Sequence, residues 1–175
     1  MKLALGGGVP TPLASAQPGP DSIAVGSGVV YWANYGATTP GTGVMSAPAS
    51  GGVVTTLTLT SGRPVSLAIS STMAYWADLI GETVQGVPLG GGAAVVLASG
   101  RDQPRSIAAD DETVAWVDQG DSDGSNGVVS SVPSGGGSIT TLATGQPSPA
   151  SIAMDATNVY WTNESGCNAG PGIVM

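Results

Sequence analysis

An acidic stretch in the second half of the chain has the residue types of a calcium loop. It runs from Asp118 to Gly127, and Asp118, Asp121 and Asp123 supply its carboxylates. Calcium takes roughly six to eight oxygen ligands on a flexible backbone, so this alternation of acidic residues with Ser, Asn and Gly suits the ion. The stretch lacks the closing Glu of an EF-hand and has no flanking helices. We favour a plain flexible acidic loop and keep calcium as the alternative.

Other candidates for chemistry are few. The chain contains no histidine, which excludes Ser-His-Asp catalysis, Cys-His catalysis and histidine-bearing zinc sites. The carboxylates at 110–112 could serve as an acid and base pair, but their place between two expected strands favours a solvated turn. Cys167 has no His or Lys neighbour that would activate its thiol, and one cysteine cannot form an internal disulfide.

The charge balance excludes several kinds of partner. The net charge is −8, from twelve acidic and four basic residues. Such a surface repels phosphate backbones and anionic lipids, so we expect neither nucleic acid nor a membrane surface as a partner. No apolar run has the length of a membrane span, and the first residues do not read as a secretory signal peptide.

Behind these candidate residues lies a four-fold repeat. A Ser-(Ile/Leu)-Ala segment is followed each time by an aromatic pair or its equivalent and then by Asn or Asp. All the tryptophans of the chain stand at one position of this pattern, at intervals of 40 to 45 residues: Trp32, Trp76, Trp116 and Trp161. We expect these four side chains to form the core of each unit. The Asn or Asp two residues later is expected to cap backbone N–H groups at a strand end.

Each unit is predicted to contain four short strands. In the first copy they cover 22–25, 29–34, 44–48 and 53–57. The second is apolar on both faces and so must be covered on both sides, as in sheets that stack face to face. A Gly-Gly turn joins the third strand to the fourth, because glycine tolerates positive φ. Four strands and one tryptophan in about 43 residues predict an all-β protein, a β-propeller with one blade per unit.

The two ends of the chain match the same strand of the repeat. Counted from Met1, the units are approximately 1–44, 45–84, 85–129 and 130–174, and Met175 starts the next. One interpretation is a four-bladed ring in which the termini share a blade. The other, which we favour, is a fragment of a six- to eight-bladed propeller. An open array would expose the apolar faces of its end blades.

The motif Tyr-Trp-Thr-Asn at 160–163, with Tyr-Trp-Ala-Asp at 75–78, resembles the YWTD repeats of the low-density lipoprotein receptor family. The whole unit resembles still more the repeats of secreted and lipoprotein propellers of myxobacteria. This resemblance covers essentially the whole chain. It implies propeller blades and an extracytoplasmic home, but no particular function.

The blade geometry predicts where a ligand would bind. Loops from the second to the third strand, and loops between blades, emerge on one face of a propeller. They carry Tyr35, Arg63, Arg101 and Arg105. We therefore expect a non-enzymatic scaffold that binds a protein, a small molecule or a glycan on this face. The alternatives are a propeller-type lyase or hydrolase using carboxylates and a metal, and a structural repeat segment of a larger surface protein, whose neighbouring blades would then be its partners.

Overall fold

The structure is a computed structural model, and it describes residues 1–36, 41–121, 125–164 and 173–175. These residues form four antiparallel sheets, which we call blades 1 to 4. Blade 1 contains β1 (Pro20–Gly26), β2 (Val29–Asn34), β3 (Gly43–Pro48) and β4 (Thr55–Leu59). Blade 2 contains β5 (Pro64–Ile69), β6 (Met73–Asp78), β7 (Thr83–Pro88) and β8 (Val95–Ser99).

Blade 3 contains β9 (Pro104–Ala109), β10 (Thr113–Asp118), β11 (Gly127–Pro133) and β12 (Thr140–Gln146). Blade 4 has three strands in the described residues, β13 (Pro149–Met154), β14 (Val159–Asn163) and β15 (Ile173–Val174). Within each blade the strands pair in the order of the sequence. The repeat units counted from Met1 therefore have their boundaries inside third strands, whereas each blade begins at the first strand.

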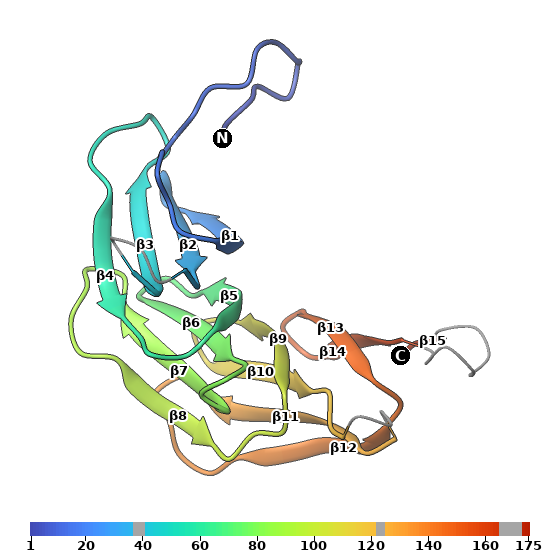
Figure 1. The fold of residues 1–175 in the computed structure, drawn as a ribbon. Helices are drawn as coiled ribbons and strands as arrows, with labels where there is room; N and C mark the ends of the chain where they lie inside the picture. Colours follow the sequence, from blue (N-terminus) through green and yellow to red (C-terminus); the bar gives the residue numbers. More distant parts are fainter. Residues whose placement is uncertain (37–40, 122–124, 165–172) are drawn as a thin grey trace.

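The four sheets stand one after another around an arc, as blades of a propeller do (Figure 1). The first strands β1, β5, β9 and β13 lie side by side on the inside of the arc. The two ends of the chain lie apart, with the N-terminal segment at blade 1 and β15 at blade 4 (Figure 1). The predicted all-β propeller fold is confirmed.

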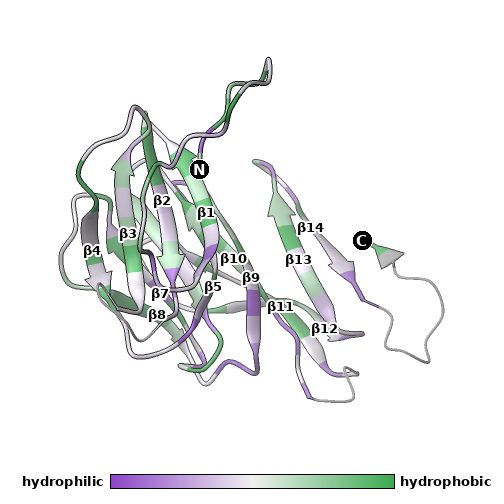
Figure 2. Ribbon diagram, turned by 45° about the horizontal axis from the view of Figure 1, so that its top comes forward, coloured by the Kyte–Doolittle hydropathy of each residue, from purple (hydrophilic) through white to green (hydrophobic). Residues whose placement is uncertain are grey.

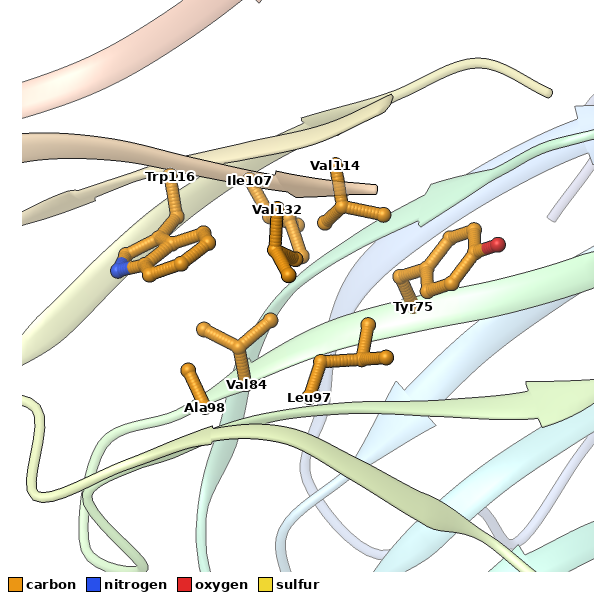
Figure 3. Close-up of a cluster of buried hydrophobic side chains, with 8 residues drawn as sticks. All are labelled: Tyr75, Val84, Leu97, Ala98, Ile107, Val114, Trp116 and Val132. Atoms are coloured by element: carbon orange, nitrogen blue, oxygen red, sulfur yellow. The ribbon is translucent and has the colours of Figure 1, made fainter. Parts of the chain in front are cut away.

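The core lies between neighbouring sheets. Second strands are buried along almost their whole length in blades 1 to 3. Neighbouring sheets cover both faces in blades 2 and 3, whereas Leu13 and Ala14 of the N-terminal segment cover one face of β2. Between blades 2 and 3, the side chains of Tyr75, Val84 and Leu97 meet those of three residues from the next sheet (Figure 3): Ile107, Trp116 and Val132. Of the tryptophans predicted to form the core of each unit, Trp32, Trp76 and Trp116 are buried, whereas Trp161 in blade 4 is only partly buried.

A repeated hydrogen bond joins each first strand to the next. The hydroxyl of Ser22 accepts from the backbone N–H of Leu67 at 2.9 Å. Ser66 accepts in the same way from Ile107, and Ser106 from Ile152, at 3.2 and 3.3 Å. We call these three bonds the serine ladder. They hold neighbouring blades in register along the inside of the arc.

Gly-Gly turns close the outer hairpins of blades 1 to 3. In blade 1 the N–H of Gly51 donates to the carbonyl of Pro48 at 2.8 Å, and Gly51 and Gly52 have φ values of 97° and 143°. Side chains rarely adopt such φ values, which explains the glycines at this place. The same turn recurs after Pro88 and Pro133.

Candidate binding face

A hollow of about 520 Å³ lies where the beginnings of the first strands of blades 1 to 4 converge. It lies on the face at which the loops between blades emerge. Two arginines, two glutamine side chains and one carboxylate give it its chemistry: Arg63, Arg105, Gln103, Gln119 and Asp21. Asp21, Arg63, Gln103 and Arg105 lie at or directly before the start of a first strand, and Gln119 follows the end of β10.

Arg63 is held firmly by its backbone. Its N–H donates to Asp78 Oδ1 at 2.7 Å, and its carbonyl accepts from the N–H of Leu79 at 2.9 Å. The guanidinium lies over the ring of Tyr35, 4.9 Å from its centroid, and this contact favours a cation. The Nε atom of Arg63 is buried and has no hydrogen-bond partner within the described part of the chain. A strong donor is therefore left unsatisfied beside the hollow.

Arg105 stands on the other side of the hollow, in β9. Its Nη1 donates to Gln119 Oε1 at 2.7 Å, and the N–H of Gln119 in turn donates to the carbonyl of Gln103 at 3.0 Å. The glutamine thus orients the guanidinium and leaves its remaining donors for a ligand. Arg63 and Arg105 line one hollow, which is an arrangement suited to planar anions such as carboxylates.

Arg101 takes a different place from its predicted companions. Its Nε lies 3.1 Å from Asp118 Oδ2, and its guanidinium lies over the ring of Trp116 at 5.8 Å. It does not line the hollow that contains Arg63 and Arg105. The structure therefore brings Tyr35, Arg63 and Arg105 together on the predicted face, while Arg101 contacts the blade 3 core.

The acidic residues of the predicted calcium loop are only partly described. Asp118 is buried and paired with Arg101 and with the Trp116 indole N–H, at 3.2 Å. Burial raises the pKa of Asp118 to about 6, although the charge of Arg101 acts in the opposite direction. Asp121 accepts from Asn126 Nδ2 at 2.7 Å, and Asp123 lies outside the described residues, as does Cys167. The described residues contain no group of three acidic, His or Cys side chains that could hold a metal. Calcium stays a prediction.

The candidate acid and base pair at 110–112 serves the turns of its own and the neighbouring blade. Asp110 Oδ1 accepts from the backbone N–H groups of Glu112 and Thr113 at 2.8 and 2.7 Å. Asp111 accepts from the N–H of Ser71 at 2.7 Å, and this bond lowers the pKa of its carboxyl group. The turn follows β9, whereas Arg105 lies at the start of that strand, so these carboxylates stand at the opposite end of the blade from the hollow.

Beside each tryptophan, the expected polar position is occupied in different ways. Asp78 caps backbone N–H groups as predicted, since Oδ1 accepts from Arg63 and from Gly81, at 2.7 and 2.8 Å. Asn34 and Asn163 instead donate from Nδ2 to a glutamine carbonyl, at 3.0 and 3.1 Å. Gln17 and Gln146 supply these carbonyls, and sequence reasoning did not identify them. They could have been recognised by their position, because each stands three residues before the proline that begins the first strand.

No protein-family model and no curated protein matches the chain. Several solved structures are similar to it. A chain of a nidogen/laminin complex matches with a TM-score of 0.70 and 21% identity over 82% of this chain, which spans 56% of that chain's length. The computationally designed Ika4 protein matches with a TM-score of 0.71 and 12% identity, over 94% of each chain. A putative TolB from Agrobacterium tumefaciens has a TM-score of 0.58 and 17% identity, covering 81% of this chain and 56% of its own. At such identities the similarity shows the fold, a β-propeller.

Within the described residues there is no helix, hence none with the length and apolar character needed to cross a bilayer.

Proposed function

We propose that the chain is a non-enzymatic protein-binding propeller, and that its partner places a carboxylate-bearing segment between Arg63 and Arg105. The observation that carries this proposal is the hollow itself, which contains two guanidinium groups on a chain with only four basic residues. The buried Nε of Arg63 has no acceptor among the described residues. An incoming carboxylate would supply acceptors at this place.

The net charge of the chain limits where an acidic ligand can bind. The net charge of −8 repels acidic partners in general, so an acidic segment binds only where arginines outweigh nearby carboxylates. Among the described residues that line the hollow, Asp21 is the single carboxylate beside the two arginines. Bonds from a guanidinium to a carboxylate are charge-assisted and bidentate, which favours this class of ligand over a neutral one.

The similarity to a chain crystallised in a nidogen/laminin complex supports a protein partner, because that propeller belongs to an assembly of two proteins. The repeat resemblance supports an extracytoplasmic location, and we include it in the proposal. Loops on a rigid propeller scaffold commonly carry binding residues, as Arg63 and Tyr35 do here.

The proposal is tested with a short fluorescent peptide that carries two glutamates, followed by fluorescence anisotropy. We expect saturable binding that weakens with salt. Arg63→Gln and Arg105→Gln should each weaken it about tenfold or more, since a hydrogen bond to a charged group contributes about 1.5–3 kcal/mol. Lys2→Gln removes the same charge away from the hollow and should leave the affinity unchanged.

Two results would overturn the proposal. One is equal binding of the peptide's glutamine counterpart, which would show that carboxylates are not recognised. The other is an affinity for the glutamate peptide that does not respond to either arginine substitution. Binding of a neutral oligosaccharide in place of the peptide would favour a glycan ligand and would likewise contradict a carboxylate-bearing partner.

A further inference from the structure

The hollow that contains Arg63 and Arg105 has polar groups at two depths. First strands begin at the face where the hollow opens, so a residue further along such a strand lies deeper below this face. Arg63 directly precedes β5 and Gln103 directly precedes β9, and both lie at the mouth of the hollow. Ser66 and Ser106 are the third residues of these two strands and lie at its floor. Three residues of extended chain separate mouth and floor by roughly 8–10 Å.

The mouth carries the positive charge. Arg63 is fixed there through its carbonyl, which accepts from the N–H of Leu79. Arg105 is the second residue of β9, but its Nη1 donates to Gln119 Oε1, and the N–H of Gln119 is bonded to the carbonyl of Gln103. These bonds direct the guanidinium of Arg105 toward the mouth, to the level of Arg63. The beginning of β9 is accordingly hydrophilic, whereas the later part of this strand is apolar (Figure 2).

The floor carries two half-buried hydroxyl groups that keep their capacity to donate. Ser66 accepts from the N–H of Ile107 and Ser106 from that of Ile152, as members of the serine ladder. A bond of this kind occupies a lone pair of the hydroxyl oxygen and leaves its proton for another partner. In the described part of the chain, neither hydroxyl donates to an acceptor. Because an accepted hydrogen bond polarises a hydroxyl group, each of the two is a strengthened donor.

A ligand that fills the hollow to its floor must supply acceptors for these hydroxyls. A carboxylate suits them, because hydrogen bonds to a charged acceptor are shorter and stronger than bonds between neutral groups. An ammonium group is unsuited, since the arginines at the mouth repel it. Asp21, the carboxylate of the lining, belongs to blade 1, whereas Ser66 and Ser106 belong to blades 2 and 3. The anion at the floor therefore lies toward blades 2 and 3.

The depth of the hollow decides which carboxylates reach its floor. A glutamate side chain extends about 5 Å from its Cα, because it spans four bonds of about 1.5 Å. A segment that crosses the mouth therefore brings its side chains to the arginines but not to the serines. A chain end that enters along the strand direction covers roughly 8–10 Å with about three residues. Between the two levels, Val65 and Ala150 provide an apolar wall for an aliphatic side chain of that chain end.

We propose that the hollow captures the C-terminal end of the partner's chain. The terminal carboxylate accepts from the hydroxyls of Ser66 and Ser106 at the floor. An acidic side chain one or two residues earlier lies between Arg63 and Arg105 at the mouth. This inference rests on the proposed function, since it concerns the same hollow and the same class of partner, and it adds the part of the partner that is recognised. Capture of a C-terminal carboxylate is a recurring mode of peptide recognition.

The test compares two forms of one fluorescent peptide by anisotropy. Both carry glutamates at the second and third positions from the C-terminus, a valine at the last position and the label at the N-terminus. One form ends in a free carboxylate and the other in a carboxamide. We expect the free acid to bind about tenfold more tightly, because the amide loses the charge that strengthens its bonds to the two hydroxyls. The double variant Ser66→Ala/Ser106→Ala should bind both forms with equal affinity.

Ser22→Ala is the matched control. The Ser22 hydroxyl makes the shortest bond of the serine ladder, at 2.9 Å, but it lines a different hollow, together with Ile23 and Trp32. This substitution removes a ladder bond without removing a donor from the floor, so the free acid should keep its advantage of about tenfold. Circular dichroism establishes that the serine variants keep their sheets. The comparison of the two peptides on the parent chain needs no substitution, so it tests the inference even if a variant unfolds.

Equal affinities of the two peptides for the parent chain would overturn this inference. If both peptides still depended on Arg63 and Arg105, the proposed function would stand without it. A preference for the free acid that survives Ser66→Ala/Ser106→Ala, or that Ser22→Ala abolishes to the same extent, would also overturn it. If neither peptide binds, the proposed function fails and the inference fails with it.

Discussion

Blades 1 and 3 use different side chains to provide hydrogen-bond partners for the tryptophan indole N–H and for the Asn or Asp two residues later. In blade 1, Gln17 Oε1 accepts from both Trp32 Nε1 and Asn34 Nδ2, at 3.1 and 3.0 Å. In blade 3, Arg101 replaces the glutamine and Asp118 replaces the asparagine, and the two form an ion pair beside Trp116. Blade 4 has the same uncharged pair as blade 1, formed by Gln146 and Asn163. In blades 1, 3 and 4 the two positions change together, as a pair in contact would.

Blade 2 departs from both solutions. Ser61 stands where the glutamine or arginine would be, and Asp78 is satisfied by Thr60 and by backbone N–H groups instead. Trp76 Nε1 consequently has no partner in the described part of the structure. A buried donor without an acceptor costs stability, so the pair in the other blades is worth more than its hydrogen bonds alone.

The largest effect should come from breaking the charged pair. Arg101→Gln leaves the buried Asp118 carboxylate without its cation and should lower the free energy of unfolding by about 3–5 kcal/mol. Urea unfolding at neutral pH measures this loss. Adding Asp118→Asn gives blade 3 the glutamine and asparagine of blades 1 and 4, and should recover most of it.

Arg105→Gln is the matched control, because Arg105 is exposed, and it should change stability by less than about 0.5 kcal/mol. If Arg101→Gln and Arg105→Gln cost the same, the ion pair contributes little and the two blades do not differ as described.

A pH dependence should distinguish the charged pair from the neutral one. The pKa of Asp118 is about 6 in the folded chain, above its ordinary value of 3.8. The folded state therefore holds the proton to higher pH than the unfolded state, so this stability is present below about pH 4 and is lost as the pH rises through 6. A shift of roughly two pKa units corresponds to about 3 kcal/mol.

Other carboxylates act in the opposite direction, since the pKa of the Asp155 carboxyl is lowered by hydrogen bonds from its own turn. The measurement is therefore the difference in unfolding free energy between the parent chain and the double variant Arg101→Gln/Asp118→Asn, followed from pH 4 to 7. Parallel curves for the two proteins would contradict a raised pKa at Asp118.

The smallest effect should come from the neutral pair. Gln17→Ala removes the acceptor shared by Trp32 and Asn34 and should cost about 1–2 kcal/mol of unfolding free energy, because two largely buried donors lose their partner. Thermal or urea unfolding measures it. Gln103→Ala, at an exposed glutamine, serves as the comparison and should have less than about 0.5 kcal/mol of effect. If both substitutions lowered the unfolding free energy equally, the hydrogen bonds of Gln17 to Trp32 and Asn34 would not contribute to stability as described.

The sequence predicts the fold well because every unit repeats the same order of strands and turns with one tryptophan. The four copies therefore support the same assignment of strands, turns and core. It also predicts that Arg63 and Arg105 lie on the same face, because each stands next to a connection between two blades. Arg101 lies in the loop directly before β9, and Arg105 lies at the start of that strand. The direction of a side chain depends on its partner, and Asp118, the partner of Arg101, lies 17 residues further along the chain. Loop position alone could not distinguish the two arginines.

Other features needed contacts between blades. The serine ladder was visible only as a repeated Ser before Ile or Leu, because the bond joins residues more than forty positions apart. Gln17 and Gln146 were missed since their loops read as irregular. The sequence predicts that the end blades expose apolar side chains. It does not identify Ile23 and Tyr160 as two of these side chains, because their exposure depends on contacts between blades.

The serine ladder also gives the array a direction. Every blade carries an acceptor toward the following blade and a donor toward the preceding one, so two blades can join in only one order. Each junction therefore uses the same bond, whatever the number of units. Duplicating or deleting one whole unit in the gene leaves every remaining junction with its donor and its acceptor. Such a chain can change its length in evolution and keep the same serine hydrogen bond at every junction between neighbours.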